Sequence, residues 1–350
     1  MDHHITIRSI EDSPVVRDGL KRVVNRSKSA VVVFKIYDNW RLRRQLKSGN
    51  IETLHGATHS RKNVEESIAY INAQFADYLN YADLNAAGIA GTRILELGFG
   101  DNLGVALKFI AAGALSVVCL DRFYSQRDQE HQLEIYRALR ETLNEDEKGR
   151  FDAAITLKSK IETRDDVLRC IYGTSLDEAR DDLMQQYGAF DLIISRAVLE
   201  EIYEPDSTFA AMAALTRTGG CLAHKIDLTD YGIFRDRGMH PLTFLTIPES
   251  IYRLMATDSG IPNRRLIGYY RKRMSELGFD AKLFVTSVVG VGALDPHLEK
   301  PKAGVDYSQA TIDLIDQIRP KLSGEFRGLP DEDLLVEGIF LVARKEGARN

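Results

Sequence analysis

The segment RILELGFGDNLGVALKFIAAGALSVVCLDRF, residues 93–123, carries the strongest structural signal in this chain. Its stretch Ile94–Leu97 predicts a strand that ends in a glycine-rich turn, where residues without a Cβ can adopt positive φ. Apolar residues then recur at helical spacing, and a second apolar run at 116–120 stops at an acid, Asp121. This order is typical of a nucleotide-binding unit, in which such an acid accepts the hydroxyls of a ribose.

The spacing of the glycines distinguishes two classes of cofactor. A dinucleotide fingerprint has the order GxGxxG, whereas the glycines here stand at 98, 100 and 104. Glu96 precedes the first glycine by two residues, and a carboxylate suits a cationic ligand better than a pyrophosphate. A dinucleotide oxidoreductase therefore stays only as an alternative, to be favoured if NAD binds.

The E-x-G-x-G arrangement followed by Asp121 resembles the first motif of class I S-adenosylmethionine-dependent methyltransferases. A second segment, FDLIISRAVLEEIYEPD at 190–206, predicts a strand ending at Ser195 and a helix from about Ala197. It resembles the fourth motif of the same family, whose strand end lies beside the transferable methyl group. The resemblance spans roughly residues 90–290 and implies S-adenosylmethionine as cofactor, with Asp121 on its ribose.

The adenine contact departs from the family pattern, because no acid stands at the usual position in the segment 171–179. Arg122 and Phe123 are expected to stack on the base, with ordinary packing as the alternative for Phe123. Asn102 replaces a common third glycine, and Asp101 is expected to reach the methionine amine through water. The expected cofactor-binding residues are Glu96, Gly98, Gly100, Asp101, Asn102, Asp121, Arg122, Phe123, Ser175, Leu176 and Ser195.

Polar residues at the end of a later strand are the candidates for catalysis. In GGCLAHKIDLTDYG, residues 219–232, His224, Asp227 and Asp230 are expected at the rim of the pocket. An alcohol acceptor must lose its proton during attack, so His224 is the first choice for the base, oriented by Asp227 or Asp230. Strand alternation places His224 and Ile226 on one face of the sheet, and Lys225 and Asp227 on the other. The three residues could alternatively hold a divalent metal, but their spacing is weak evidence and no metal is assigned.

The acceptor is suggested only by a finer resemblance. The segments ELGFGDNLG and HKIDLTDY resemble a bacterial group of such methyltransferases that is linked to surface saccharides, with Phe99 and Tyr231 replacing a proline and a histidine of its patterns. This implies O-methylation of a saccharide or another hydroxyl-bearing small molecule. N-methylation, which needs no dedicated base, and a non-catalytic S-adenosylmethionine-binding protein are the alternatives.

Strands alternating with helices predict an α/β fold. Helical connections between the first five strands force parallel pairing, and two later strands add a final antiparallel hairpin. The expected result is a seven-stranded, mostly parallel sheet with helices on both faces. Its strands are predicted at 93–97, 116–120, 169–172, 190–195, 219–226, 281–289 and 336–343.

Two regions are expected along the chain. Residues 1–88 are a helical N-terminal extension, and residues 89–350 are the methyltransferase domain, with insertions at 124–168 and 291–334. Within the extension, a helix from residue 64 to 82 is expected, capped by Asn63 and Glu66. Residues 56–84 resemble the helical extension that lies over the cofactor in this family, which implies a lid. Residues 56–60 would be its hinge.

Composition indicates a cytoplasmic globular protein. The chain of 350 residues is 44% hydrophobic with a formal net charge of −5, and it shows neither a signal peptide nor a transmembrane segment. The three cysteines are expected to be core residues. Nucleic-acid binding is not expected, and the oligomeric state is left open.

Basic residues gather in two places. The first fifty residues hold eleven Lys or Arg against five Asp or Glu, and a basic amphipathic helix predicted at 13–28 either packs on the protein or makes a peripheral contact with anionic lipid. A second basic helix is expected at 262–277. It is either a solvated face or a dock for a phosphorylated or carboxylated acceptor.

Overall fold

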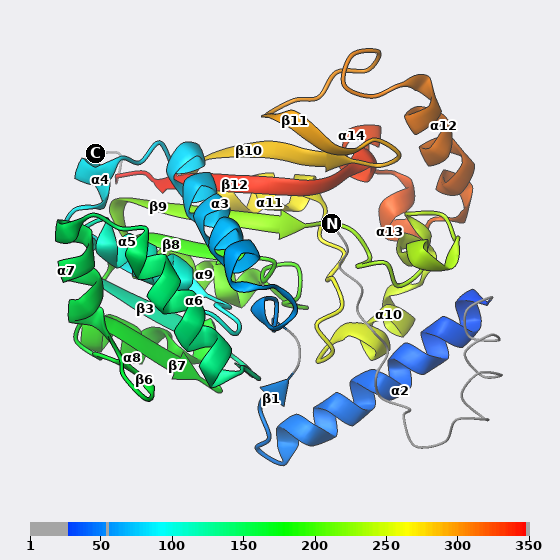
Figure 1. The fold of residues 1–350 in the computed structure, drawn as a ribbon. Coiled ribbons are helices and arrows are strands. Elements are labelled where there is room, and N and C mark those ends of the chain that lie inside the picture. The colour runs from blue at the N-terminus through cyan, green and yellow to red at the C-terminus, as the bar shows by residue number, and fades with distance from the viewer. Residues whose placement is uncertain (1–26, 54–55, 348–350) are drawn as a thin grey trace.

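The computed structural model describes residues 27–53 and 56–347, so the basic helix predicted at 13–28 lies almost wholly outside the described residues. One large sheet has the strand order β11-β10-β12-β9-β8-β2-β3-β7 (Figure 1). The five parallel strands are β2 (Arg93–Leu97), β3 (Ser116–Asp121), β7 (Leu168–Tyr172), β8 (Phe190–Arg196) and β9 (Thr216–Asp227).

The last strands complete the sheet at one edge. Strand β12 (Val336–Lys345) runs antiparallel between β9 and β10 (Phe279–Val288), as predicted for the final pair. The α/β fold with a mostly parallel sheet is thus confirmed, but the sheet has eight strands rather than seven. The additional strand, β11 (Gly292–Leu298), belongs to the predicted insertion and folds back onto the free edge of β10, where unpaired backbone groups are available.

Helices cover both faces of the sheet (Figure 1). Alternate residues of each strand enter two separate apolar clusters, because side chains in a strand point to opposite faces: Ile94 lies in one cluster and Leu95 in the other. One face is covered by α3 (Val64–Ala82), α5 (Gly104–Ala111), α6 (Gln129–Glu141) and α7 (Glu145–Ala154). The opposite face is covered by α8 (Leu176–Tyr187), α9 (Asp206–Leu215) and α11 (Ile267–Glu276).

Helix α3 has the predicted bounds and the predicted cap. The Asn63 side chain accepts from the Glu66 N–H at 2.8 Å, and the Glu66 carboxylate accepts from the Asn63 N–H at 3.0 Å. The buried residues Ile71, Tyr78 and Ala82 recur on one side of the helix, which lies across β9 and β12. Local sequence therefore predicted both the bounds and the N-terminal cap of this helix.

Both insertions contain more structure than predicted. Residues 124–168 hold α6, α7 and a small hairpin of β5 (Ile155–Leu157) and β6 (Ile161–Thr163), and strand β4 (Tyr124–Ser125) pairs with β1 (Glu52–Thr53) of the extension. Residues 291–334 hold β11, α12 (Gln309–Ile318), α13 (Gly324–Arg327) and α14 (Asp331–Leu335).

Two helix starts differ from the prediction. Residues 197–205 form a loop instead of a helix, and α9 begins only after Pro205, at Asp206. The predicted helix at 262–277 begins at Ile267, because Arg264 has a φ of 62°, which no α-helix accommodates. Both loops lie near the carboxyl ends of the parallel strands.

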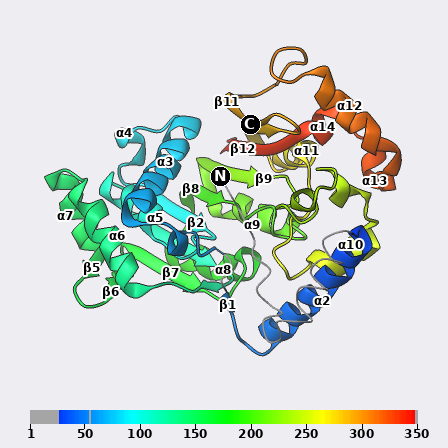
Figure 2. The same ribbon diagram turned by 45° about the vertical axis from the view of Figure 1, so that its right-hand side comes forward.

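A long helix, α2 (Lys28–Lys47), was not predicted as an element. It packs against α10 (Glu249–Ala256) at an outer corner of the molecule (Figures 1 and 2). Among the helices of the described residues, none is long and apolar enough to cross a bilayer.

Candidate active site

The glycine turn and Asp121 meet at the carboxyl ends of β2 and β3. Gly98 and Gly100 have φ values of 66° and 62°. The Asp121 carboxylate accepts from the Gly100 N–H at 3.3 Å and from the Phe123 N–H at 2.9 Å, while burial raises its pKa. Asp121 therefore lies beside the turn at the edge where open α/β sheets bind ligands.

Glu96 is a buried carboxyl group just below this turn. The Cys119 thiol approaches one of its oxygens at 3.8 Å, and burial raises the pKa of Glu96 to about 8. Within the described part of the chain, no Lys, Arg or His forms an ion pair with it. A ligand cation reaching Glu96 would stabilise its charged form.

Asp101 and Asn102 make contacts within the protein that differ from the predicted ligand contacts. The Asp101 carboxylate accepts from the N–H groups of His59 at 3.1 Å and Ser60 at 3.2 Å, and its own N–H donates to the carbonyl of Gly56 at 3.2 Å. These bonds fasten the expected hinge, residues 56–60, onto the glycine turn. The Asn102 side chain accepts from the Gly104 N–H at 2.6 Å and so supports the start of α5.

Of the residues predicted near the adenine, Ser175 and Leu176 have structural roles, and Arg122 is accessible to solvent. Ser175 caps α8 and Leu176 is buried in the core. Arg122 is exposed, and its guanidinium lies 3.9 Å from the Asp258 carboxylate and 5.8 Å from the centre of the Phe123 ring. A cavity of about 440 Å³ opens here between α2 and the end of β3, lined by Arg43, Leu46, Lys47, Arg122 and Asp258.

His224 does not lie at the rim of a pocket, contrary to the prediction. Its side chain is 0% exposed and faces the apolar cluster that contains Ile226. Its Nδ1 pairs with the Ser195 hydroxyl at 2.7 Å, and burial lowers its pKa to about 3. Both side chains are enclosed by the core, so neither reaches a ligand directly, although the backbone at the end of β8 stays at the site edge.

Neither Asp230 nor Asp227 lies beside His224 in the fold. The buried Asp230 carboxylate accepts from the N–H groups of Gly232, Phe234 and Arg235 at 2.7–3.2 Å and stabilises a turn. Asp227 projects from the face opposite to His224, as alternation predicted, and accepts from the Thr229 N–H at 2.7 Å. The predicted arrangement of a His base oriented by either acid is therefore wrong in its geometry.

Sequence reasoning missed a different polar cluster, formed by Glu200, Glu201 and Tyr231. The Tyr231 hydroxyl donates to Glu200 at 3.0 Å, and the same Glu200 oxygen accepts from the Asp227 N–H at 2.9 Å. The other Glu200 carboxyl oxygen is buried and has no hydrogen-bond partner in the part of the chain that the structure describes. Burial raises the Glu200 pKa well above its usual range. The sequence signal that could have located this cluster is the pair of consecutive acids, Glu200 and Glu201, shortly after an apolar strand.

Glu201 occupies the accessible side of this cluster. It is only partly buried, and it lies beside the α-carbon of Gly260 in a neighbouring loop. Burial raises its pKa to about 8, a hydrogen bond with the Tyr231 hydroxyl opposes the rise, and the charge of Asp121 adds to it. Glu201 thus interacts with Tyr231 and, through charge, with the predicted ribose acid. The φ of Tyr231 is 53°, which is unusual for a tyrosine.

Beneath α3, the same edge of the sheet is basic. Arg196 at the end of β8 and Lys225 on β9 are direct neighbours in register, and Arg196 forms an ion pair with Asp77 of α3 at 2.8 Å. Burial and Arg196 lower the pKa of Lys225 to about 8. Across residues 27–53 and 56–347, no side chain or carbonyl bonds to the Lys225 ammonium. This edge of the sheet therefore carries cations at Arg196 and Lys225, and it carries carboxyl groups near Tyr231.

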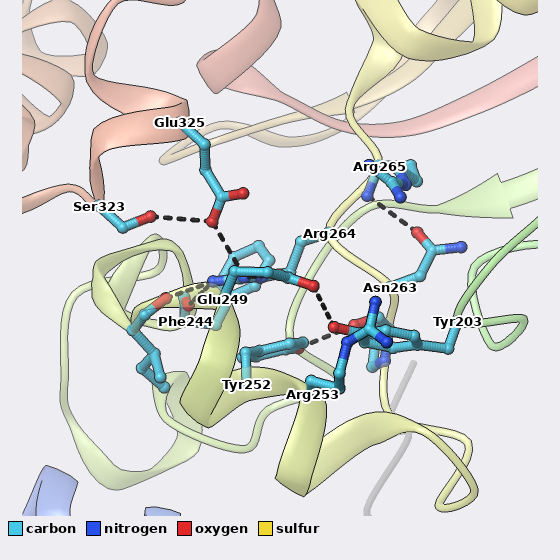
Figure 3. Close-up of polar contacts among 12 residues, drawn as sticks. Tyr203, Phe244, Glu249, Tyr252, Arg253, Asn263, Arg264, Arg265, Ser323 and Glu325 are labelled. Carbon is cyan, nitrogen blue, oxygen red and sulfur yellow. Dashed lines mark hydrogen bonds and ion pairs between the residues drawn. The ribbon is translucent and has the colours of Figure 1, made fainter.

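Arg264 holds the loops behind this site together (Figure 3). Its side chain is 1% exposed, donates to the carbonyl of Ile247 at 2.6 Å, and forms ion pairs with Glu249 and Glu325. Glu249 in turn accepts from Tyr203, in the loop that carries Glu201. In the predicted basic helix, Arg271, Lys272 and Arg273 are paired with acids and Arg265 is exposed, which favours the solvated-face interpretation over a dock.

The burial of His224 predicts a pH effect on stability rather than on catalysis. Because its folded pKa lies below the usual 6.5, the neutral form is favoured by folding, so this contribution is complete above pH 6.5 and is lost as the pH falls toward 3. Between pH 7.5 and 5.0, wild type should lose about 2 kcal/mol more unfolding free energy than His224→Gln. Urea unfolding at both pH values measures the difference, and parallel curves for the two proteins would contradict it.

Comparison with known proteins yields only distant likenesses. No family model and no curated protein sequence matches the chain. A putative S-adenosylmethionine-dependent methyltransferase from Listeria monocytogenes is 12% identical with a TM-score of 0.38, over 78% of this chain and 99% of the other. A putative sarcosine dimethylglycine methyltransferase from Galdieria sulphuraria is 14% identical with a TM-score of 0.37, over 80% and 85%.

An arsenic(III) S-adenosylmethionine methyltransferase from Chlamydomonas reinhardtii is 15% identical with a TM-score of 0.37, over 80% of this chain and 75% of the other. Identities and TM-scores at this level assign no function. The functional conclusion therefore depends on the residues of the site.

Proposed function

We propose that this protein is a methyltransferase that uses S-adenosylmethionine and methylates a hydroxyl group of a small molecule or saccharide. The supporting observation is the juxtaposition of Glu96, the glycine turn and Asp121 at one edge of the sheet. Asp121, on the backbone N–H groups of Gly100 and Phe123, suits a ribose diol. Glu96 is a buried carboxyl that pairs with no cation among the described residues, and it suits the ammonium of the methionine part.

When bound, S-adenosylmethionine supplies an electrophilic methyl group on a sulfonium. The task of the protein is then to align the acceptor for in-line attack and to remove its proton. Glu201 is the best-placed base, because it is partly accessible, lies near Asp121 and has a pKa near working pH. Its carboxylate would take the proton of the acceptor hydroxyl, and Tyr231, which Glu200 holds through a hydrogen bond, would keep that carboxylate in position.

Asp121→Ala tests the cofactor assignment. Loss of two ribose hydrogen bonds should weaken S-adenosylmethionine binding by about 1 to 3 kcal/mol, measured by calorimetry. Asp181→Ala, which removes an exposed acid elsewhere, is the matched control and should bind as wild type. Unchanged affinity in folded Asp121→Ala would remove Asp121 from the site, and binding of NAD in place of S-adenosylmethionine would favour the oxidoreductase alternative.

Transfer of labelled methyl from S-adenosylmethionine into fractionated cell extract tests the activity itself. Label in a saccharide or small-molecule fraction supports the proposal. Mild base releases the label as methanol from a methyl ester, and boiling hydriodic acid releases it as methyl iodide from a methyl ether, whereas a methylated amine keeps the label under both treatments. Tight binding without transfer into any fraction would instead favour a non-catalytic binding protein.

A further inference from the structure

Helix α2 exposes a row of large apolar side chains. Val33, Tyr37 and Trp40 are 66%, 54% and 49% exposed, and their spacing of four and three residues places them on one side of the helix. The opposite side is buried: the Asn39 amide donates to the carbonyl of Leu254 at 3.0 Å and accepts from the Asp258 N–H at 2.8 Å. The helix is thus fixed on α10 with an apolar face directed outward.

Arg41 and Arg44 lie near the Trp40 end of this exposed row, whereas Lys35 is buried on the opposite side of the helix and Arg43 is paired with Asp258. Helix α2 holds six Lys or Arg against one acid, Asp38, in a chain whose net charge is −5. The Arg44 guanidinium lies 4.8 Å from the centre of the Trp40 ring, and Arg41 is paired with Asp38 at 3.2 Å on the surface. Aromatic side chains with adjacent cations are typical of helices that lie in the interface of an anionic membrane.

Charge also discriminates among the possible occupants of this face. Two copies of α2 meeting face to face would bring two strongly basic helices together, which is unfavourable. Residues 13–26 of the same chain carry four Lys or Arg and one Asp, so electrostatic repulsion disfavours them as a cover as well. An anionic surface is the complementary partner.

We propose that the α2 face, defined by Val33, Tyr37, Trp40, Arg41 and Arg44, is a docking surface for an anionic lipid bilayer. The apolar row enters the headgroup region while the arginines contact lipid phosphates. Helix α10 adds Ile251 and Leu254, which are 38% and 55% exposed, at the same corner of the molecule (Figure 2). This inference is independent of the methyl-transfer proposal.

The experiment uses Trp40, which is the single tryptophan of the chain. Full-length protein is mixed with vesicles of phosphatidylcholine containing about 30% phosphatidylglycerol, or of phosphatidylcholine alone. With the anionic vesicles, Trp40 emission should shift to shorter wavelength, brominated lipid should quench it, and the protein should sediment with the vesicles in a salt-sensitive manner. Pure phosphatidylcholine should produce little of this.

Charge-reversal variants complete the test. The double variant Arg41→Glu/Arg44→Glu should partition onto anionic vesicles at least tenfold more weakly, whereas the matched control Arg164→Glu/Arg169→Glu, with the same charge change on exposed arginines near β7, should bind as wild type. Equal binding by both double variants would overturn the proposal. So would Trp40 emission that is already shielded from acrylamide without lipid, because another part of the protein or a second copy would then cover the face.

Discussion

Glu201→Gln is expected to lower the rate of methyl transfer about 100-fold or more while changing S-adenosylmethionine affinity less than threefold. The amide keeps the size of the side chain but cannot accept the acceptor proton, and general-base catalysis typically contributes a factor of this order. In the wild type the rate should rise with pH through about 8, where Glu201 ionises. The variant should lose this rise. The assay is labelled methyl transfer to the active extract fraction.

Glu204→Gln is the matched control for this prediction. Glu204 lies three residues away, is exposed and is paired with Arg253 at the surface, so its substitution should leave both rate and pH profile unchanged. If Glu201→Gln retains full activity, Glu201 is not the base. An amine acceptor, which attacks in its neutral form, would then be the better explanation.

Arg264→Ala is expected to lower the free energy of unfolding by about 3 kcal/mol. The change removes hydrogen bonds to buried carbonyls and two ion pairs, together with the stacking of the guanidinium 3.9 Å from the centre of the Tyr252 ring (Figure 3). Glu249 and Glu325 are both partly exposed and regain water, which limits the loss. Urea unfolding measures the effect.

Arg265→Ala provides the comparison at the adjacent position. Arg265 is exposed, so its loss should cost less than about 0.5 kcal/mol. Arg264→Ala should in addition speed hydrogen exchange in the loop of Tyr203 and Glu201, because Glu249 bonds to Tyr203. If the two variants are equally stable, the Arg264 network does not hold these loops together.

Secondary structure followed closely from local sequence in this protein. Apolar runs located all seven predicted strands to within a few residues, and the Asn63–Glu66 capping box located the start of α3. These signals depend on neighbouring residues only, so the chain carries them before it folds. The predictions failed for α2 and at two helix starts, where Ala197 and Arg264 adopt positive φ values that the sequence does not indicate.

The candidate site was predicted only in part, for a reason visible at His224. Alternation correctly placed His224 and Ile226 on one face of β9 and Asp227 on the other. It could not show which positions near the strand ends the covering segments would enclose, and His224 became fully enclosed. Conversely, Glu201 and Tyr231 lie thirty residues apart, and they meet only because β8 and β9 are adjacent strands.

The sequence by itself determined the α/β fold, the glycine turn and the position of Asp121 at a strand end, because periodicity and glycine geometry act over a few residues. Tertiary structure alone decided which polar groups are accessible. It enclosed His224 and Ser195, placed Glu201 beside Tyr231, and left the apolar row of α2 outside. Accessibility depends on packing between segments distant in the sequence, which no local pattern contains.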